Sequence, residues 1–224
     1  MRVRKRKNGE ARRAACGSLL LPFDKNEPAR MEPSALFPDK KRFHLEIGCG
    51  KGAFITTLAG KNPEVGFLAV EKVSDVILLA AEKARGAALE NVRFLCCDAE
   101  YLPRVLPAHF AERIYLNFCD PWPKARHAKR RLTYRDSLTR IAGLLAPDGV
   151  VAFQTDNREL FDFSIAEFEA AGFSLRYITY DLHASEWACD NIMTEYERNF
   201  SEKGFKINRL EAFLPQSAEF SENF

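Results

Sequence analysis

The stretch FHLEIGCGKG, residues 43–52, begins as an apolar run and ends with three glycines at alternate positions. A short apolar run that stops at glycines is typical of a strand buried in a sheet. The glycines let the backbone turn sharply after that strand and approach a ligand closely. The stretch lacks the Gly-Lys-Ser/Thr ending of a P-loop, and Ala53 stands where the G-x-G-x-x-G dinucleotide pattern has its third glycine. It therefore predicts a tight strand-to-helix turn that can hold a ligand.

Similar apolar runs recur along the chain, and segments with helical periodicity separate them. We expect strands at residues 43–47, 66–71, 92–96, 113–118, 150–155 and 173–180, and a last one near 195–200. Helical spacing predicts helices at about 51–60, 73–84, 134–145 and 161–168. This alternation predicts an α/β fold: a doubly wound, mostly parallel, seven-stranded sheet with helices on both faces. We place this domain at residues 43–209, after a basic, proline-containing N-terminal arm (1–42) and before a C-terminal tail (210–224).

Acidic residues follow the strands at the edge where such sheets bind ligands. Glu71 lies 21 positions after Gly50, a separation at which an acid accepts hydrogen bonds from a ribose. Asp98 follows the third strand and could meet an adenine amino group or cap a turn. Asp120 follows the fourth strand, within DPWP, whose prolines restrict the backbone. Asp156 follows the fifth, where a helix N-cap is equally expected. Together they predict a nucleoside-type cofactor, without separating NAD from S-adenosylmethionine.

The charge of the chain is unevenly distributed. Its net charge is +2, yet residues 1–13 carry seven basic residues against one acid, and residues 124–135 carry six against none. The rest of the chain is therefore strongly acidic. Two basic segments on an acidic body indicate a polyanionic partner, although a charged run by itself is usually only a solvated surface.

The six cysteines and the hydropathy pattern restrict the class of protein. No pair of cysteines has C-x-x-C or zinc-finger spacing, so we expect reduced, mostly buried thiols and no metal site. No apolar run reaches the roughly 18 residues that a membrane span needs, and the charged N-terminus lacks the apolar core of a secretory signal. These features favour a cytoplasmic protein without a membrane partner.

The segment DPWPKARHAKRR, residues 120–131, resembles the most specific motif of the bacterial tRNA (guanine-N7)-methyltransferase family, which belongs to the class I S-adenosylmethionine-dependent methyltransferases. LEIGCGKG (45–52), the isolated Glu71, the region of Asp98, QTDN (154–157) and TEYE (194–197) match in the same order. The resemblance covers roughly residues 43–207. Cys119 departs from it, because family members often have proline before the aspartate, and the backbone there is less constrained.

The resemblance implies methyl transfer from S-adenosyl-L-methionine to N7 of a guanine in the tRNA variable loop, with S-adenosyl-L-homocysteine as product. It implies that Asp120 is catalytic. The implied cofactor-binding residues are Glu46, Gly48, Gly50, Glu71, Asp98 and Asp120. The implied substrate-binding residues are Lys124, Asp156, Thr194, Glu195, Tyr196 and Glu197. The implied RNA-binding residues are Arg126, His127, Lys129, Arg130 and Arg131. We expect tRNA as partner, no obligatory protein partner, and a monomer or homodimer.

Three other functions fit parts of the pattern. A methyltransferase with a small-molecule acceptor would not need the basic segments. An NAD-dependent oxidoreductase would fit the glycines and Glu71, but it needs a hydride-site partner that the sequence does not indicate. A non-catalytic RNA-binding protein would not need acids at the ends of five strands. Measuring whether activity depends on RNA distinguishes a small-molecule methyltransferase from the tRNA methyltransferase that the resemblance implies.

Overall fold

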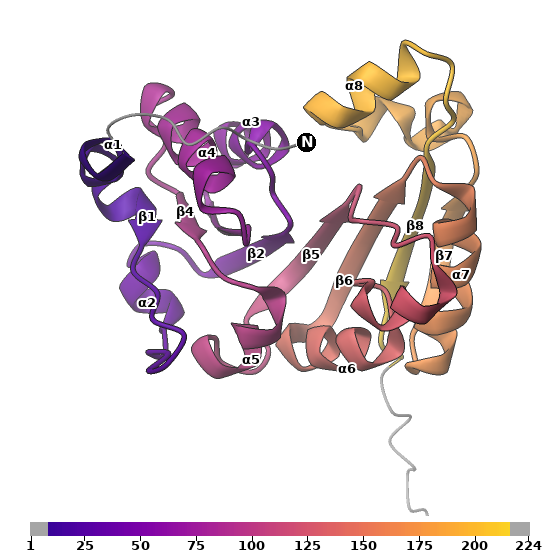
Figure 1. The fold of residues 1–224 in the computed structure, drawn as a ribbon, viewed down its shortest axis with the longest axis horizontal. Helices are drawn as coiled ribbons and strands as arrows, with labels where there is room; N and C mark the ends of the chain where they lie inside the picture. The colour runs from indigo at the N-terminus through magenta and orange to yellow at the C-terminus, as the bar shows by residue number, and fades with distance from the viewer. Residues whose placement is uncertain (1–8, 216–224) are drawn as a thin grey trace, which may run out of the picture.

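The structure is a computed structural model that describes residues 9–215, except the side chains of Asp190 and Glu195. Its strands are β1 (Leu20–Leu21), β2 (Arg42–Ile47), β3 (Val65–Val70), β4 (Val92–Leu95), β5 (Ala111–Asn117), β6 (Leu145–Thr155), β7 (Ser174–Thr179) and β8 (Asn208–Phe213). They form one sheet in the order β1-β4-β3-β2-β5-β6-β8-β7 (Figure 1). β8 is antiparallel to β6 and β7, and the other neighbours pair in parallel. The predicted mostly parallel α/β sheet is confirmed, with eight strands instead of seven.

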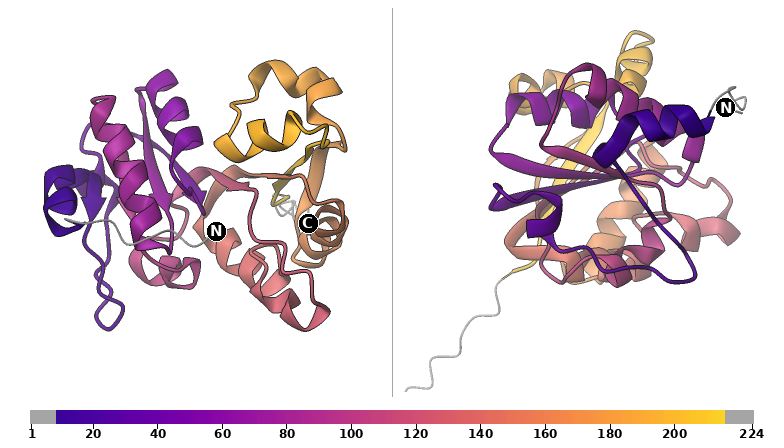
Figure 2. Two further views of the ribbon diagram at one scale, coloured as in Figure 1. Left: turned by 45° about the horizontal axis from the view of Figure 1, so that its top comes forward. Right: turned by 90° about the vertical axis from the view of Figure 1, so that its left-hand side faces the viewer.

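Helices cover both faces of this sheet, as predicted for a doubly wound fold. The α-helices are α1 (Gly9–Cys16), α2 (Pro33–Leu36), α3 (Ala53–Lys61), α4 (Ser74–Gly86), α5 (Leu102–Val105), α6 (Arg135–Leu144), α7 (Arg158–Ala170) and α8 (Glu195–Ser201). α1, α3 and α4 pack together on one face, whereas α5, α6 and α7 lie on the other (Figures 1 and 2). The chain changes winding direction between the neighbouring strands β2 and β5.

Alternation along the strands produces two hydrophobic cores. Ile114 and Leu116 of β5 are buried in the core under α5, α6 and α7. Tyr115, between them, is buried on the opposite side with Phe54 of α3. Successive side chains of a strand point to opposite faces, so a strand buried on both faces reads as a nearly continuous apolar run. This explains why β2 to β6 were recognisable in the sequence.

The position expected for the last strand was wrong. Residues 195–200 were expected to form a strand, but they lie in α8, and the last strand is β8 at Asn208–Phe213. Residues 9–42 of the segment placed in the N-terminal arm contribute α1, β1 and α2. Arg12 of α1 donates two hydrogen bonds of 2.7 and 2.6 Å to Glu82 of α4, and β1 pairs with β4. Residues 1–8, which hold most of the N-terminal basic run, lie outside the described residues.

Both outer strands of the sheet depart from a long regular edge. β1 is two residues long. β7 shifts register against β8 between Arg176 and Thr179, where Tyr177 has a positive φ of 53°. Among residues 9–215, none of the helices has the length and hydropathy needed to cross a membrane.

Candidate functional site

The glycine turn after β2 forms the floor of the site. Gly48, Gly50 and Gly52 all have positive φ, at 85°, 55° and 75°, a region that favours glycine. Gly52 also permits a close approach, because a Cβ there would lie 2.6 Å from the Cβ of Ala80 in α4. The amide of Gly48 donates to the carbonyl of Val70 at 2.8 Å, which fixes the turn to the end of β3.

The predicted cofactor residues gather at the carboxyl ends of four adjacent strands. Gly48, Glu71, Asp98 and Asp120 follow β2, β3, β4 and β5, and they line one pocket of about 320 Å³. The pocket lies beside the β2–β5 switch point, where open α/β sheets bind ligands. The roles of these residues in cofactor binding stay predictions. Their position around one pocket is consistent with contact to a single ligand.

Glu71 and Asp98 also hold the backbone around this pocket. Glu71 accepts hydrogen bonds from the amides of Gly50 at 3.3 Å and Val73 at 2.9 Å, so its carboxylate joins the glycine turn to the start of α4. Asp98 accepts from the amide of Glu100 at 3.2 Å and caps a short 3₁₀ turn. Both carboxylates are therefore fixed in orientation before any ligand binds.

Glu46 is a buried carboxyl group with one oxygen unpaired. Its Oε1 accepts from Asn117 Nδ2 at 3.1 Å, and its Oε2 has no hydrogen-bond partner within the described chain. Burial raises the pKa of Glu46 to about 8, and the neighbouring Glu71 carboxylate adds to this shift. Glu46 lines a second pocket of about 420 Å³, next to the first, together with Gly48, Gly50 and residues of the α8 region.

Asp120 points into the first pocket from a turn that another predicted residue holds in place. Its side chain is 69% exposed, and Oδ2 lies 3.8 Å from Lys72 Nζ. Arg131 donates to the carbonyl of Pro121 at 2.9 Å and to that of Trp122 at 3.1 Å. Its guanidinium also lies 4.2 Å from the centre of the Phe163 ring. The structure therefore places Arg131 as a clamp on the DPWP turn.

The other residues predicted to meet RNA lie on the outside of this turn. Lys124, Arg126 and Lys129 are exposed, and all three belong to or flank a 3₁₀ segment at Ala125–Arg130. Arg130 lies over the Trp122 ring at 5.0 Å from its centre, and His127 contacts the same ring edge-on at 5.7 Å. The turn thus presents its cations to solvent beside Asp120.

Apart from Lys124, the residues predicted to bind the substrate lie near the turn after β6 and at the start of α8. Asn157, not Asp156, caps α7, by accepting from the Leu160 amide at 2.7 Å. Burial raises the pKa of Asp156, and a hydrogen bond from Tyr196 opposes this shift. Tyr196 also packs against Phe118, with ring centres 5.1 Å apart. The Glu195 side chain lies outside what the structure describes.

The TEYE segment forms a capping box at the start of α8. Thr194 Oγ1 accepts from the Glu197 amide at 2.8 Å, and Glu197 Oε2 accepts from the Thr194 amide at 3.3 Å. The spacing Ser/Thr-x-x-Glu is the sequence signature of this motif, and it could have indicated a helix here. Thr194 and Tyr196 line the 420 Å³ pocket, whereas Glu197 is fully buried behind it.

The sequence analysis did not predict three polar residues that lie near the site. Asn117 holds Glu46, as described above, while His183 Nε2 and Asn191 Nδ2 both contact Glu197 Oε1. The His183 contact measures 2.8 Å. Alternation in RIYLN would have placed Asn117 on the same face as Arg113 and Tyr115. His183 and Asn191 carry no local signal, because their position depends on how the chain between β7 and β8 folds back.

Comparison with known proteins identifies the family. A family model described as "Putative methyltransferase" matches residues 40–210. The tRNA (guanine-N(7)-)-methyltransferase of Brevibacillus brevis is 48% identical over 176 residues, which cover 79% of this chain and 82% of that protein. The chain belongs to the tRNA (guanine-N7)-methyltransferase family. The family member from Lactococcus lactis subsp. cremoris strain MG1363 is 41% identical over 218 residues, 96% of this chain and 100% of its own length.

Solved structures agree with the fold of this tRNA (guanine-N7)-methyltransferase family member. The 16S rRNA methyltransferase KamB superposes with a TM-score of 0.62 at 17% identity, over 84% of this chain and 97% of that one. At this identity the likeness shows the fold alone, which is the class I methyltransferase fold. The fold expected from the sequence resemblance is confirmed.

Proposed function

We propose that this protein transfers the methyl group of S-adenosyl-L-methionine to N7 of a guanine in the variable loop of tRNA. The observation that carries the proposal is the convergence of Gly48, Glu71, Asp98 and Asp120 on one pocket, in a chain of this family. The relatives carry the name of that activity. The following paragraphs derive what the chain's own residues contribute.

The two adjoining pockets fit S-adenosyl-L-methionine by their polar groups. Glu46 Oε2, in the pocket of about 420 Å³, is buried without a partner among the described residues, so a polar group of a ligand would satisfy it. Glu71 and Asp98 are carboxylates with fixed orientation at the two neighbouring strand ends, where ribose hydroxyls and an adenine amino group would find acceptors. When bound, this cofactor supplies an electrophilic methyl group on a sulfonium.

Guanine N7 has a free lone pair, so methylation at N7 requires no prior loss of a proton. The protein therefore needs no strong base, but positive charge develops on the purine ring as the new bond forms. A carboxylate held beside that ring opposes the developing charge, and preorganised charge of this kind lowers the barrier. We assign this role to Asp120. Its 69% exposure would fall when the base covers it, and the field of the carboxylate would strengthen as water leaves.

Orientation of the RNA falls to the cations on the outside of the turn. Lys124, Arg126, Lys129 and Arg130 face solvent next to Asp120 and could contact phosphates, which fix register without reading sequence. Asp156, Thr194 and Tyr196 stand on the other side of the site and could meet the base. Positioning of N7 opposite the methyl group contributes alongside the charge of Asp120.

The experiment is methylation of bulk tRNA that lacks this modification, with labelled S-adenosyl-L-methionine, followed by nucleoside analysis. We expect 7-methylguanosine as the labelled product. Parallel reactions with free guanosine and with a tRNA transcript whose variable-loop guanine is replaced by adenine test the acceptor. Label in any other nucleoside, or equal label in the replaced transcript, would contradict the proposal.

A further inference from the structure

A groove crosses the sheet on the face opposite α5, α6 and α7. Its floor is made by β2, β5, β6 and β8, and its walls by α3 and residues 177–192. Its volume is about 650 Å³, larger than the pockets at the glycine turn. Nothing in the methyl-transfer chemistry above uses this space.

Strand alternation makes the floor of this groove polar. Arg113, Gln154 and Glu211 face the groove from β5, β6 and β8. Their strand neighbours Ile114 and Phe153 point the other way, into the core under the helices. These strands thus send apolar side chains to the face under the helices, whereas polar side chains stand beside Tyr115 and Ala152 on the groove face. The opposite face keeps polar groups that need partners.

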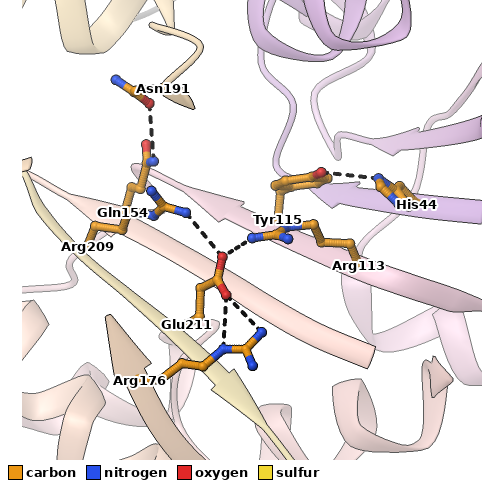
Figure 3. Close-up of polar contacts among 8 residues, drawn as sticks. All are labelled: His44, Arg113, Tyr115, Gln154, Arg176, Asn191, Arg209 and Glu211. Atoms are coloured by element: carbon orange, nitrogen blue, oxygen red, sulfur yellow. Dashed lines mark hydrogen bonds and ion pairs between the residues drawn. The ribbon is translucent and has the colours of Figure 1, made fainter. Parts of the chain in front are cut away.

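Three arginines surround a single buried carboxylate in the floor. Glu211 is 5% exposed and accepts from Arg113, from Arg209 Nη2 at 3.1 Å and from Arg176 at 3.2 Å (Figure 3). Burial lowers the pKa of His44, at the edge of this floor, to about 4, so that His44 adds no charge at neutral pH. The groove itself is lined by two guanidinium groups, Arg113 and Arg209, and two carboxylates, Glu186 and Glu211, so its lining charges balance. Arg176 adds a third guanidinium, which approaches Glu211 from β7.

Two buried polar atoms in the floor lack partners among the described residues. One is the acceptor Gln154 Oε1, and the other is the donor Arg209 Nε. Gln154 uses its amide nitrogen to donate to Asn191 at 3.3 Å (Figure 3). An unsatisfied buried donor or acceptor costs about 1–3 kcal/mol, so both atoms favour a ligand that offers an acceptor and a donor together.

Aromatic side chains supply flat surfaces around these atoms. Phe54 and Tyr115 line the groove on the side of α3, and Trp187 and Tyr177 line it on the other side. The Trp187 and Tyr177 rings are 5.4 Å apart. Aromatic platforms beside arginine side chains are a combination that binds unpaired nucleotides, because every base has a face that can stack.

We infer that this groove binds a nucleotide, its base hydrogen-bonded to Gln154 and Arg209 and stacked on Trp187. The groove adjoins the methylation site, because Phe54 and Asn117 line both it and the pocket of Glu46 and Tyr196. The nucleotide is therefore an unstacked one of the same tRNA, next to the target guanine. This assignment rests on the proposed function, since it requires that tRNA is the substrate.

The two tryptophans of the chain allow a direct test. In a Trp122→Phe protein, Trp187 is the remaining tryptophan and reports on the groove. In a Trp187→Phe protein, Trp122 reports on the DPWP turn. Filter binding measures tRNA affinity of each protein independently, so a failure of tRNA binding is distinguished from a failure of the groove assignment.

We expect tRNA to quench Trp187 fluorescence with the same midpoint as its filter-binding curve. Replacement of Trp187 by alanine should weaken tRNA binding about tenfold, the lower range for loss of one stacked base. Gln154→Leu should weaken it in the same direction. Affinity for S-adenosyl-L-methionine should stay unchanged in both. Tyr180→Ala is the matched control, since Tyr180 packs on Phe161 on the other face of the sheet.

Mononucleotides at millimolar concentration separate the two sources of a nucleotide. Quenching of Trp187 by tRNA, with weaker quenching by mononucleotides, supports the assignment. Quenching by mononucleotides but not by bound tRNA would overturn the RNA assignment in favour of a free nucleotide. Unchanged Trp187 fluorescence with tRNA bound, together with unaltered affinity of Trp187→Ala, would overturn the inference entirely.

Discussion

At the scale of single residues, Asp120 and Glu46 represent two opposite environments for a carboxyl group. Asp120 is mostly exposed, and its contact with Lys72 at 3.8 Å is a surface ion pair, which contributes little to stability. Glu46 is 2% exposed and has a raised pKa. A substitution of the first should therefore affect the reaction and not the fold, whereas a substitution of the second should affect the fold in a pH-dependent way.

Asp120→Asn should lower kcat by about 10²–10³, the range for loss of one preorganised electrostatic group. Thermal stability should change little, because no strong contact of Asp120 holds the apo fold. Affinity for S-adenosyl-L-methionine should fall much less than kcat, because Glu71 and Asp98 still line the pocket. Single-turnover methylation and calorimetry measure the two effects. Glu112→Gln, an acid at the opposite end of β5, is the control. Near-normal turnover of Asp120→Asn would remove Asp120 from catalysis.

Glu46→Gln should stabilise the cofactor-free protein more at alkaline pH than at acidic pH. The folded-state pKa of about 8 lies above the ordinary value of 4.5, so the folded chain favours the protonated carboxyl group. The stability that this provides is complete below about pH 4.5 and is lost as pH rises through 8. One pKa unit corresponds to about 1.4 kcal/mol, and therefore to roughly 3–6 °C in Tm for this chain length. Melting curves at pH 5, 7 and 9 should show the gap between variant and wild type widening by several degrees. A constant gap would contradict the shifted pKa.

At the scale of elements, α8 depends on its capping box. Thr194→Ala should cost about 1 kcal/mol of stability, because the Glu197 amide loses its acceptor. Thr194→Ser keeps the acceptor and should behave as wild type in this respect. Hydrogen exchange of the α8 amides and urea denaturation measure the effect. Equal protection in the alanine and serine variants would show that the cap does not stabilise α8.

Two basic residues of the same run, Arg131 and Lys129, should have different roles. Arg131 donates hydrogen bonds to the DPWP turn, whereas Lys129 is exposed to solvent. Arg131→Ala should lower kcat and loosen the turn, because two carbonyls lose their donor. Lys129→Ala should instead weaken tRNA binding modestly and leave kcat at saturating tRNA unchanged. Steady-state kinetics over a range of tRNA concentrations distinguish these results. A pure KM effect in Arg131→Ala would show that Arg131 contacts RNA rather than the turn.

The elements that could be predicted are those whose burial produces a recognisable pattern of apolar residues in the local sequence. β2 to β6 read as apolar runs because both faces are covered, and α4, α6 and α7 keep helical spacing. β8 was missed although NRLEAF alternates polar and apolar residues over most of its length, and the last strand was placed instead at residues 195–200, which contain Tyr196 and Phe200. Those two rings stack 4.2 Å apart, as residues four apart on a helix do. β1 was missed because a strand of two residues is too short to show any periodicity of apolar residues.

The candidate site shows the same division at the scale of the whole molecule. The convergence of three acids, Glu71, Asp98 and Asp120, could be predicted without any distances. Parallel strands end at one edge of the sheet, and residues that follow such strands therefore lie near one another. Asn117, Arg209 and Glu211 required the sheet order, which the sequence does not state. The role of Arg131 could not be predicted either. The sequence does not tell whether an arginine donates to a backbone carbonyl, as Arg131 does here, or to a phosphate.

The uneven charge of the molecule should appear in the salt dependence of tRNA binding. Each phosphate contact contributes about 0.7–0.9 to the slope of log affinity against log salt. Replacement of Arg126, Lys129 and Arg130 by alanine should therefore lower the slope by roughly 2–3. Replacement of the exposed Lys25, Lys41 and Lys61 changes the net charge equally and should leave the slope nearly unchanged. Filter binding across a salt series gives both slopes. Equal slopes for the two triple variants would mean that the turn does not contact RNA.

The interrupted outer strands bear on how copies of this protein meet at high concentration. An open sheet edge with regular, unpaired backbone groups is a template on which a strand of another molecule can add, and repeated addition leads to fibrils. Here one edge ends after Leu21, and the other breaks its register around Tyr177. A foreign strand would find at most a few consecutive partners on either side. We therefore expect strand addition at these edges to be disfavoured in the described part of the chain, and self-association there to use side-chain surfaces instead.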